Sequence, residues 1–209
     1  MTPPVKARPR AAQIAETERR VVGAAARLFV ADGYAATTLT AVADAAGVGA
    51  RTIYVRFGSK AALLKRVVDV AIVGDTEPVD VLGRDWMRAA LTAATADERL
   101  AAAAAAGRRI MERAGPVFAV AQQAAAVEPL IEAYWDEGRA QTRHTGRVFW
   151  SRMAQDGLLD PACDLDRIVD SAAVVCAAET YLLGRRMLGW SPADYEAWLL
   201  RTTTSLTRP

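Results

Sequence analysis

Residues 38–60 read TLTAVADAAGVGARTIYVRFGSK and contain two short amphipathic segments separated by glycines. The apolar residues of the first segment recur at helical spacing, at Leu39, Val42, Ala43 and Ala46. Thr37 or Thr38 can cap the start of this helix, because a hydroxyl accepts a bond from an unpaired backbone N–H. Gly47 permits the left-handed conformation that commonly ends such a helix.

The second segment predicts a helix over about residues 50–57. Ile53 and Phe57 are four residues apart, so both face the core of the domain. The residues left off the core face are Arg51, Thr52, Tyr54, Val55 and Arg56. Two short helices joined by such a turn fit a helix-turn-helix, whose second helix lies in the major groove of DNA.

Longer helices are expected on both sides of this motif. The first covers about residues 11–31 and ends at Gly33, with an apolar stripe of Ile14, Val21, Ala25, Leu28 and Phe29. Ser59 is the expected N-cap of a fourth helix over residues 60–72, whose core face is Leu63, Leu64, Val67, Val68 and Ala71. This fourth helix is the one continuous element that the sequence predicts between the motif and the rest of the chain.

The front third of the chain resembles the DNA-binding motif of TetR-type repressors. The resemblance rests on Ala25–Phe29, Gly33–Tyr34, Gly47–Val48, Thr52–Tyr54, Phe57–Lys60 and Leu63–Leu64. Gly49 stands where the family often has a capping serine, and Arg56 where an aromatic residue or histidine is common. The resemblance implies a regulator that dimerises through its last two long helices and encloses an effector pocket with its middle helices.

Candidate DNA contacts follow from side-chain chemistry and from the motif. Arg51 and Arg56 can reach guanine O6 and N7, which is the commonest specific base contact. Hydroxyls and cations can contact phosphate, which positions the protein without reading sequence. The expected contact set is Thr38, Thr40, Ala50, Arg51, Thr52, Tyr54, Val55, Arg56 and Lys60, with Arg8 and Arg10 from the arm.

Charge is distributed unevenly along the chain. Residues 1–72 contain 11 Lys/Arg and 5 Asp/Glu, whereas residues 73–209 contain 15 and 19. The basic front can approach phosphate, and the acidic rear is poorly suited to it. We therefore divide the chain into a basic arm at 1–10, a DNA-binding domain at 11–72 and a ligand-binding and dimerisation domain at 73–209. The arm is either a solvated tail or a segment that reaches the minor groove or phosphates.

The rear of the 209-residue chain has helical periodicity and no strand alternation. The expected helices cover about residues 84–95, 97–114, 116–125, 128–156, 165–188 and 192–206. Large apolar side chains on these helices favour a small-molecule pocket, although each residue by itself fits an ordinary core position. The candidates are Trp86, Met87, Met111, Phe118, Trp135, Phe149, Trp150 and Met153.

Glu179 interrupts an apolar stripe formed by Ile168, Ala172, Val175 and Leu182 on the helix predicted at 165–188. A carboxylate in such a position needs a partner. It can pair with an arginine, bind a ligand, or reach solvent at an interface.

The sequence gives no positive sign of catalysis, cofactor or metal. His144 is the sole histidine and lies among Arg139, Arg143 and Arg147, which favours a solvated helix face. Cys163 and Cys176 have no metal-site spacing, and we expect both to be core or partly buried thiols. With no apolar segment long enough for a signal peptide or membrane span, a cytoplasmic location is expected.

We therefore predict an all-α DNA-binding transcriptional regulator that acts as a repressor on a two-fold symmetric duplex site and is released from it by a small, mostly apolar effector. A homodimer is expected through about residues 165–206, because the 165–188 helix is apolar on more than one face. The last helix adds a stripe of Tyr195, Trp198, Leu199, Thr202 and Leu206. Two alternatives stay open: a helical small-molecule binding protein or enzyme with a vestigial helix-turn-helix, and an architectural DNA-binding protein without an effector.

Overall fold

The computed structural model describes residues 10–207, and every regular element in that range is a helix. The helices are α1 (Arg10–Ala36), α2 (Leu39–Ala46), α3 (Ala50–Phe57), α4 (Lys60–Val73), α5 (Asp85–Thr92), α6 (Ala96–Ala125), α7 (Pro129–Gln155), α8 (Leu165–Val175), α9 (Ala178–Leu188) and α10 (Pro192–Ser205). The predicted all-α fold is confirmed. Arg8 and most of the predicted basic arm lie outside the described residues.

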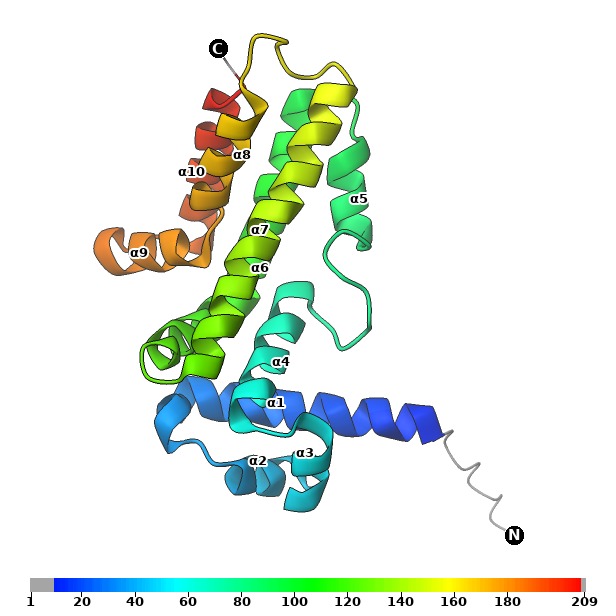
Figure 1. Ribbon diagram of the computed structural model, residues 1–209, viewed down its shortest axis with the longest axis vertical. Coiled ribbons are helices and arrows are strands. Elements are labelled where there is room, and N and C mark those ends of the chain that lie inside the picture. The colour runs from blue at the N-terminus through cyan, green and yellow to red at the C-terminus, as the bar shows by residue number, and fades with distance from the viewer. Residues whose placement is uncertain (1–9, 208–209) are drawn as a thin grey trace.

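The molecule is elongated, with α1, α2 and α3 gathered at one end (Figure 1). The long helices α6 and α7 run side by side along the rest of it, and α4 leads from the first group toward them (Figure 1). α8 and α10 lie beside α6 and α7, and α9 projects sideways from them (Figure 1). This arrangement separates the helix-turn-helix from the far ends of the rear helices.

Local sequence signals set the ends of the front helices as predicted. The Thr38 hydroxyl accepts a bond from the N–H of Ala41 at 3.1 Å and caps α2. Gly47 ends α2 in the left-handed conformation, with φ 63°. The Ser59 hydroxyl accepts from the N–H of Ala62 at 3.0 Å and caps α4.

The core faces of these helices are also largely as predicted, with two differences in α1. Val21, Ala25 and Phe29 are fully buried, but Ile14 is 43% exposed because no other helix reaches this part of α1. The backbone kinks at Gly33, with φ 78°, and helical turns continue to Ala36. The buried Thr37 then closes this end, since its hydroxyl donates to the carbonyl of Gly33 at 2.8 Å.

The predicted break between residues 114 and 116 is wrong, because α6 is continuous across Pro116. A proline inside a helix removes one hydrogen bond and costs about 3 kcal/mol. Burial along the whole helix offsets that cost: Leu100 lies in one core cluster, Met111 in a second and Val120 in a third.

The helix predicted over 165–188 is two helices, α8 and α9, separated at Cys176 and Ala177. The Thr180 hydroxyl donates to the carbonyl of Val174 at 2.6 Å, which satisfies one group released by the break. Tyr181 is fully buried against α6, where a Cβ on Gly115 would lie 2.8 Å from its ring. Glu179 therefore begins a new helix and does not share a stripe with Ile168.

The predicted apolar stripe of the last helix faces its own chain. Tyr195 and Leu199 are 1% and 4% exposed and lie in one core cluster with Met111 and Phe118 of α6. α10 approaches α6 so closely that a Cβ on Gly107 would lie 2.9 Å from Cδ2 of Leu199. Tyr195 and Leu199 are therefore covered by their own chain, whereas Trp198, Thr202 and Leu206 of the same stripe are half-buried.

More than one helix joins the front of the molecule to its rear. The core around Val21, Phe29 and Ile53 also contains Val120 of α6 and Ile131 of α7. The sequence predicted α4 as the sole continuous connection between the motif and the rear helices, but α6 and α7 also pack against the front core. A change in the packing of α6 or α7 can reach α1 directly as well as through α4.

Candidate DNA interface and ligand cavity

The exposed face of α3 carries most of the predicted DNA contacts. Ile53 alone is fully buried in this helix, while Tyr54 and Val55 are 54% and 78% exposed. Arg51, Thr52 and Arg56 are also exposed, and Ala50 is half-buried. The N-cap of α3 is Gly49, which has no side chain to cap the helix. The N–H of Thr52 donates to the Gly49 carbonyl at 2.8 Å, and the N–H groups of Ala50 and Arg51 remain open to an external acceptor such as phosphate.

The contacts predicted outside α3 are placed differently from one another. Thr38 and Thr40 are exposed at the start of α2, although the Thr38 hydroxyl already caps that helix. Arg10 is exposed at the start of α1. Lys60 is held internally: its Nζ donates to the carbonyl of Tyr34 at 2.8 Å and lies 4.2 Å from the centroid of that ring.

Arg20 is a positioning residue of this region that the sequence analysis missed. Its guanidinium donates to the carbonyl of Gly47 at 2.9 Å and also to that of Ala46. These bonds satisfy carbonyls at the end of α2, at the turn that precedes α3. No local spacing signals this contact, because its partners lie far away in the sequence.

The rear of the molecule encloses a cavity of about 840 Å³. Its lining comes from α4 to α10 and includes seven predicted pocket residues besides Met87: Trp86, Met111, Phe118, Trp135, Phe149, Trp150 and Glu179. Met153 is the exception, since it is fully buried in the core with Trp150 and Val169. The structure thus brings together most of the predicted set, from helices far apart in the sequence.

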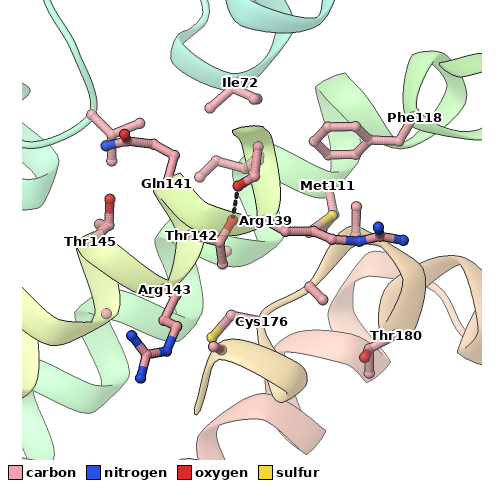
Figure 2. Close-up of a pocket in the computed structure, with 18 of the residues that line it drawn as sticks. Ile72, Met111, Phe118, Arg139, Gln141, Thr142, Arg143, Thr145, Cys176 and Thr180 are labelled. Atoms are coloured by element: carbon pink, nitrogen blue, oxygen red, sulfur yellow. Dashed lines mark hydrogen bonds between the residues drawn. The ribbon is translucent and has the colours of Figure 1, made fainter. Parts of the chain in front are cut away.

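α7 passes through the middle of this cavity region. Figure 2 shows Gln141 and Arg143 on opposite sides of α7, with Met111 and Phe118 of α6 nearby and Cys176 and Thr180 beyond. The polar residues Gln141, Thr142 and Thr145 were not predicted, because helical polar residues ordinarily face solvent. The Thr142 hydroxyl donates to the carbonyl of Gly138 at 3.0 Å (Figure 2).

Two glycines of α7, Gly138 and Gly146, also line the cavity. A Cβ built on either residue would meet no atom within 4 Å. Glycine in a helix interior costs about 1 kcal/mol relative to alanine, and no close neighbour requires it here. Gly146 is half-buried and Gly138 is exposed, so a side chain added at Gly146 would occupy space at the cavity.

Each charged residue of the cavity lining has a partner of opposite sign. These residues are Lys65, Asp69, Glu137, Arg139, Arg143 and Glu179, three positive and three negative. Lys65 lies 3.2 Å from Asp69 and 3.9 Å from Glu137. Arg139 pairs with Glu179 at 2.7 Å, and Arg143 pairs with Asp170 at 2.6 Å.

Glu179 has the partner that the sequence analysis required. Its carboxylate accepts bonds from Trp135 Nε1 at 2.8 Å and from Arg139 Nε at 2.7 Å. Burial acts to raise the pKa of Glu179, but bonds from its own backbone N–H, Arg139 and Trp135 outweigh burial and hold the pKa below its ordinary value. The carboxylate is therefore ionised and already paired, which corresponds to the arginine alternative.

The arginines around His144 form a ladder between α7 and the helices beside it. Arg139, Arg143 and Arg147 recur every four residues and pair with Glu179, Asp170 and Asp166. His144 itself is exposed. Exposed pairs of this kind contribute at most about 1 kcal/mol each, so the ladder defines the register of α8 on α7 more than it stabilises the fold.

Cys176 lines the cavity, and burial raises the pKa of its thiol to about 11. The thiol is thus protonated near neutral pH and unsuited to act as a nucleophile. Within residues 10–207, no group of three His, Cys, Asp or Glu side chains is placed to hold a metal ion. No helix in the same range is long and apolar enough to span a membrane.

Comparisons with known proteins agree with this geometry. Residues 21–67 match the family model described as bacterial regulatory proteins, tetR family. None of the curated proteins compared matches the chain by sequence.

Solved structures with a similar fold cover nearly the whole chain. A putative TetR-family regulator from Rhodococcus sp. aligns with a TM-score of 0.69 and 15% identity, over 92% of this chain and 99% of its own. The TetR-family regulator PfmR from Thermus thermophilus aligns at 0.60 and 22%, over 90% and 97%. NalD, the secondary repressor of the MexAB-OprM multidrug efflux pump in Pseudomonas aeruginosa, aligns at 0.64 and 15%, over 93% and 96%.

The matched residues, 21–67, run from α1 through α2 and α3 into α4 and so include the helix-turn-helix. The structural likeness extends through the rear helices. Residues 21–67 therefore match the helix-turn-helix region of the tetR family of bacterial regulatory proteins, and the chain has the fold of solved TetR-family transcriptional regulators.

Proposed function

We propose that this protein is a transcriptional repressor. In this proposal it binds a two-fold operator as a homodimer and is released by a small, uncharged, mostly apolar effector. The observation that carries the proposal is the exposed face of α3 in a tetR-family motif, with a large apolar cavity behind it. Repression is the activity that the name of NalD gives for a protein of the same fold. Since operator DNA is the proposed target, we also propose a cytoplasmic location.

Each subunit is proposed to place α3 in a major groove, with half-sites about 34–36 Å or a multiple apart. The open N-terminus of α3 and the hydroxyls of Thr40 and Thr52 would contact phosphate. Arg51 makes no ion pair within the described part of the chain, so its guanidinium is available to bases. Selection from random duplexes, followed by affinity measurement across salt concentrations, tests the proposal. A failure to enrich any duplex would contradict it.

Arg51→Ala is expected to relax base preference at one position of each half-site by about 1–3 kcal/mol, as the loss of a bidentate guanine contact does. The measurement is the affinity for the selected operator and for its single-base variants. Arg109→Ala, which removes an exposed arginine of α6, is the matched control and should leave every affinity unchanged. An equal loss on all sequences would assign Arg51 to phosphate.

The proposed dimer contact lies on the segment predicted as the 165–188 helix and does not use Tyr195 and Leu199 of the last helix. Val174, Leu183, Met187 and Leu188 are 69%, 46%, 69% and 65% exposed around α9 and the end of α8. A cluster of exposed apolar side chains at one projecting helix is typical of a protein interface. A two-fold contact with a second copy is the commonest way to cover it. The cluster lies within the predicted range of about 165–206.

The proposed effector is uncharged because the cavity offers no unpaired charge. Every charged lining residue has a partner of opposite sign, so a charged ligand would have to break a pair or remain unpaired. The apolar lining favours a hydrophobic molecule, and Gln141 and Thr145 offer it hydrogen bonds.

Gly146→Leu is expected to lower the affinity for a neutral apolar dye such as Nile red at least tenfold, because the new side chain fills cavity space. The measurement is a fluorescence titration. Operator affinity without dye should stay unchanged, and helix propensity should stabilise the variant by up to about 1 kcal/mol. Gly146→Ala is the control, since it gains propensity and fills little space. Equal dye affinity in Gly146→Leu and wild type would contradict a cavity site.

Coupling between the sites is proposed to run through the shared core of α1, α4, α6 and α7. A ligand that shifts α6 and α7 moves the helices on which α2 and α3 pack, and the two recognition helices of a dimer then no longer match successive grooves. Reciprocity requires operator DNA to weaken the effector by the same factor, typically about 5–150-fold.

A further inference from the structure

The two arginines of the recognition helix differ in their surroundings. Arg51, in the first turn of α3, makes no ion pair with any residue in the range 10–207. Arg56, in the last turn, forms an ion pair with Glu18 of α1 and keeps 29% of its side chain exposed. By sequence both arginines are candidate guanine contacts, but within residues 10–207 only Arg56 has an ion-pair partner.

Glu18 holds a second arginine at the same time. Its other carboxylate oxygen accepts from Nε of Arg66 on α4 at 2.8 Å, and its side chain is only 16% exposed. Arg66 also donates to the carbonyl of Thr76, in the segment that follows α4, at 2.9 Å. One carboxylate thus links α1, α3 and α4.

The physical balance favours keeping this cluster intact. Burial acts to raise the pKa of Glu18, but the hydrogen bonds and charges of Arg56 and Arg66 outweigh burial and hold the pKa below its ordinary value. If Arg56 left, a half-buried carboxylate would lose one of its two partners. Ile53 and the half-buried Phe57 pack α3 against the core, and the Arg56–Glu18 pair adds a polar contact between the last turn of α3 and α1.

We propose that Glu18 is a positioning residue that withholds Arg56 from DNA, so that Arg56 fixes the orientation of α3 and base readout falls to the first turn at Arg51. This inference rests on the proposed DNA-binding function. It assigns to Arg56 a role that its exposed position on a recognition helix would not suggest.

The test is the salt dependence of binding to the selected operator, because each arginine that contacts phosphate adds about 1 to the slope of log affinity against log salt. Arg56→Gln is expected to leave the slope as in wild type, because a withheld Arg56 contacts no phosphate. Glu18→Gln frees Arg56 and is expected to steepen the slope by about 1 for each subunit on the DNA. The double variant Glu18→Gln/Arg56→Gln should return to the wild-type slope, whereas a purely structural role of Glu18 would not give this pattern.

Two controls accompany these variants. Asp32→Asn removes one negative charge from an exposed position of α1 and measures the general effect of charge on binding. Circular dichroism checks that each variant is folded at the assay temperature. If Glu18→Gln does not fold, Arg56→Gln still tests the inference.

A flatter slope in Arg56→Gln alone would overturn the inference while leaving the proposed function intact. An unchanged slope in folded Glu18→Gln, or a steeper slope in Asp32→Asn of the same size, would also overturn it. A wild type without salt-dependent binding would instead refute the proposed function, and this inference with it.

Discussion

Ile53→Ala is expected to destabilise the protein by about 2–5 kcal/mol and to abolish operator binding. Ile53 is 0% exposed to solvent and is the single fully buried residue of α3. Removing its side chain loses the burial energy and leaves a cavity between α3 and the core. Since the free energy of unfolding of a native protein is about 5–15 kcal/mol, the expected loss is a large fraction of the total stability. Urea denaturation measures the loss, and operator affinity below the unfolding transition measures the effect on DNA.

Val55→Ala is the matched control, because Val55 is two residues away on the same helix and is 78% exposed. Its unfolding free energy should stay within about 0.5 kcal/mol of wild type. If Ile53→Ala unfolds at the wild-type urea concentration, α3 is held by something other than its buried residue.

Leu183→Asp is expected to convert the proposed dimer to monomer. The substitution places a charge in the exposed apolar cluster around α9, where the partner subunit would leave it unpaired. A penalty of about 3 kcal/mol or more corresponds to at least a hundredfold weaker dimer. Sedimentation velocity at micromolar protein checks the result, and operator affinity should fall with the dimer.

Val127→Asp is the control for this substitution, since Val127 is 81% exposed in the short connection between α6 and α7. It adds the same charge to an exposed apolar position outside the α9 cluster and should leave the dimer intact. A monomeric wild type, or a dimeric Leu183→Asp, would rule out this surface.

The front of the molecule was the most predictable part because its signals are local. Thr38, Gly47 and Ser59 set helix ends through contacts within a few residues, and periodicity alone placed Ile53 inside and Tyr54 outside. The same reasoning failed at Ile14, which has helical spacing but no helix packed over it.

The rear was predictable in class and wrong in detail. Composition and periodicity predicted helices with large apolar side chains, and most of those side chains do line a common cavity. Pro116 predicted a break in α6 that does not occur, because burial along the helix offsets the cost of the proline. No residue type in the sequence predicted the break at Cys176. Tyr195 and Leu199 were correctly predicted to be buried. Their spacing does not determine whether the same chain or a second chain covers them.

The sequence by itself determined the all-helical class, the helix-turn-helix and the exposed face of α3, because caps, glycine turns and apolar periodicity act within about four residues. The tertiary structure alone decided the pairs between distant residues: Glu18 with Arg56, Arg139 with Glu179, and Tyr195 with the core on α6. Such pairs depend on how whole helices pack against one another. The sequence shows that a charge or an apolar stripe needs a partner, and the packing of the helices determines which residue that partner is.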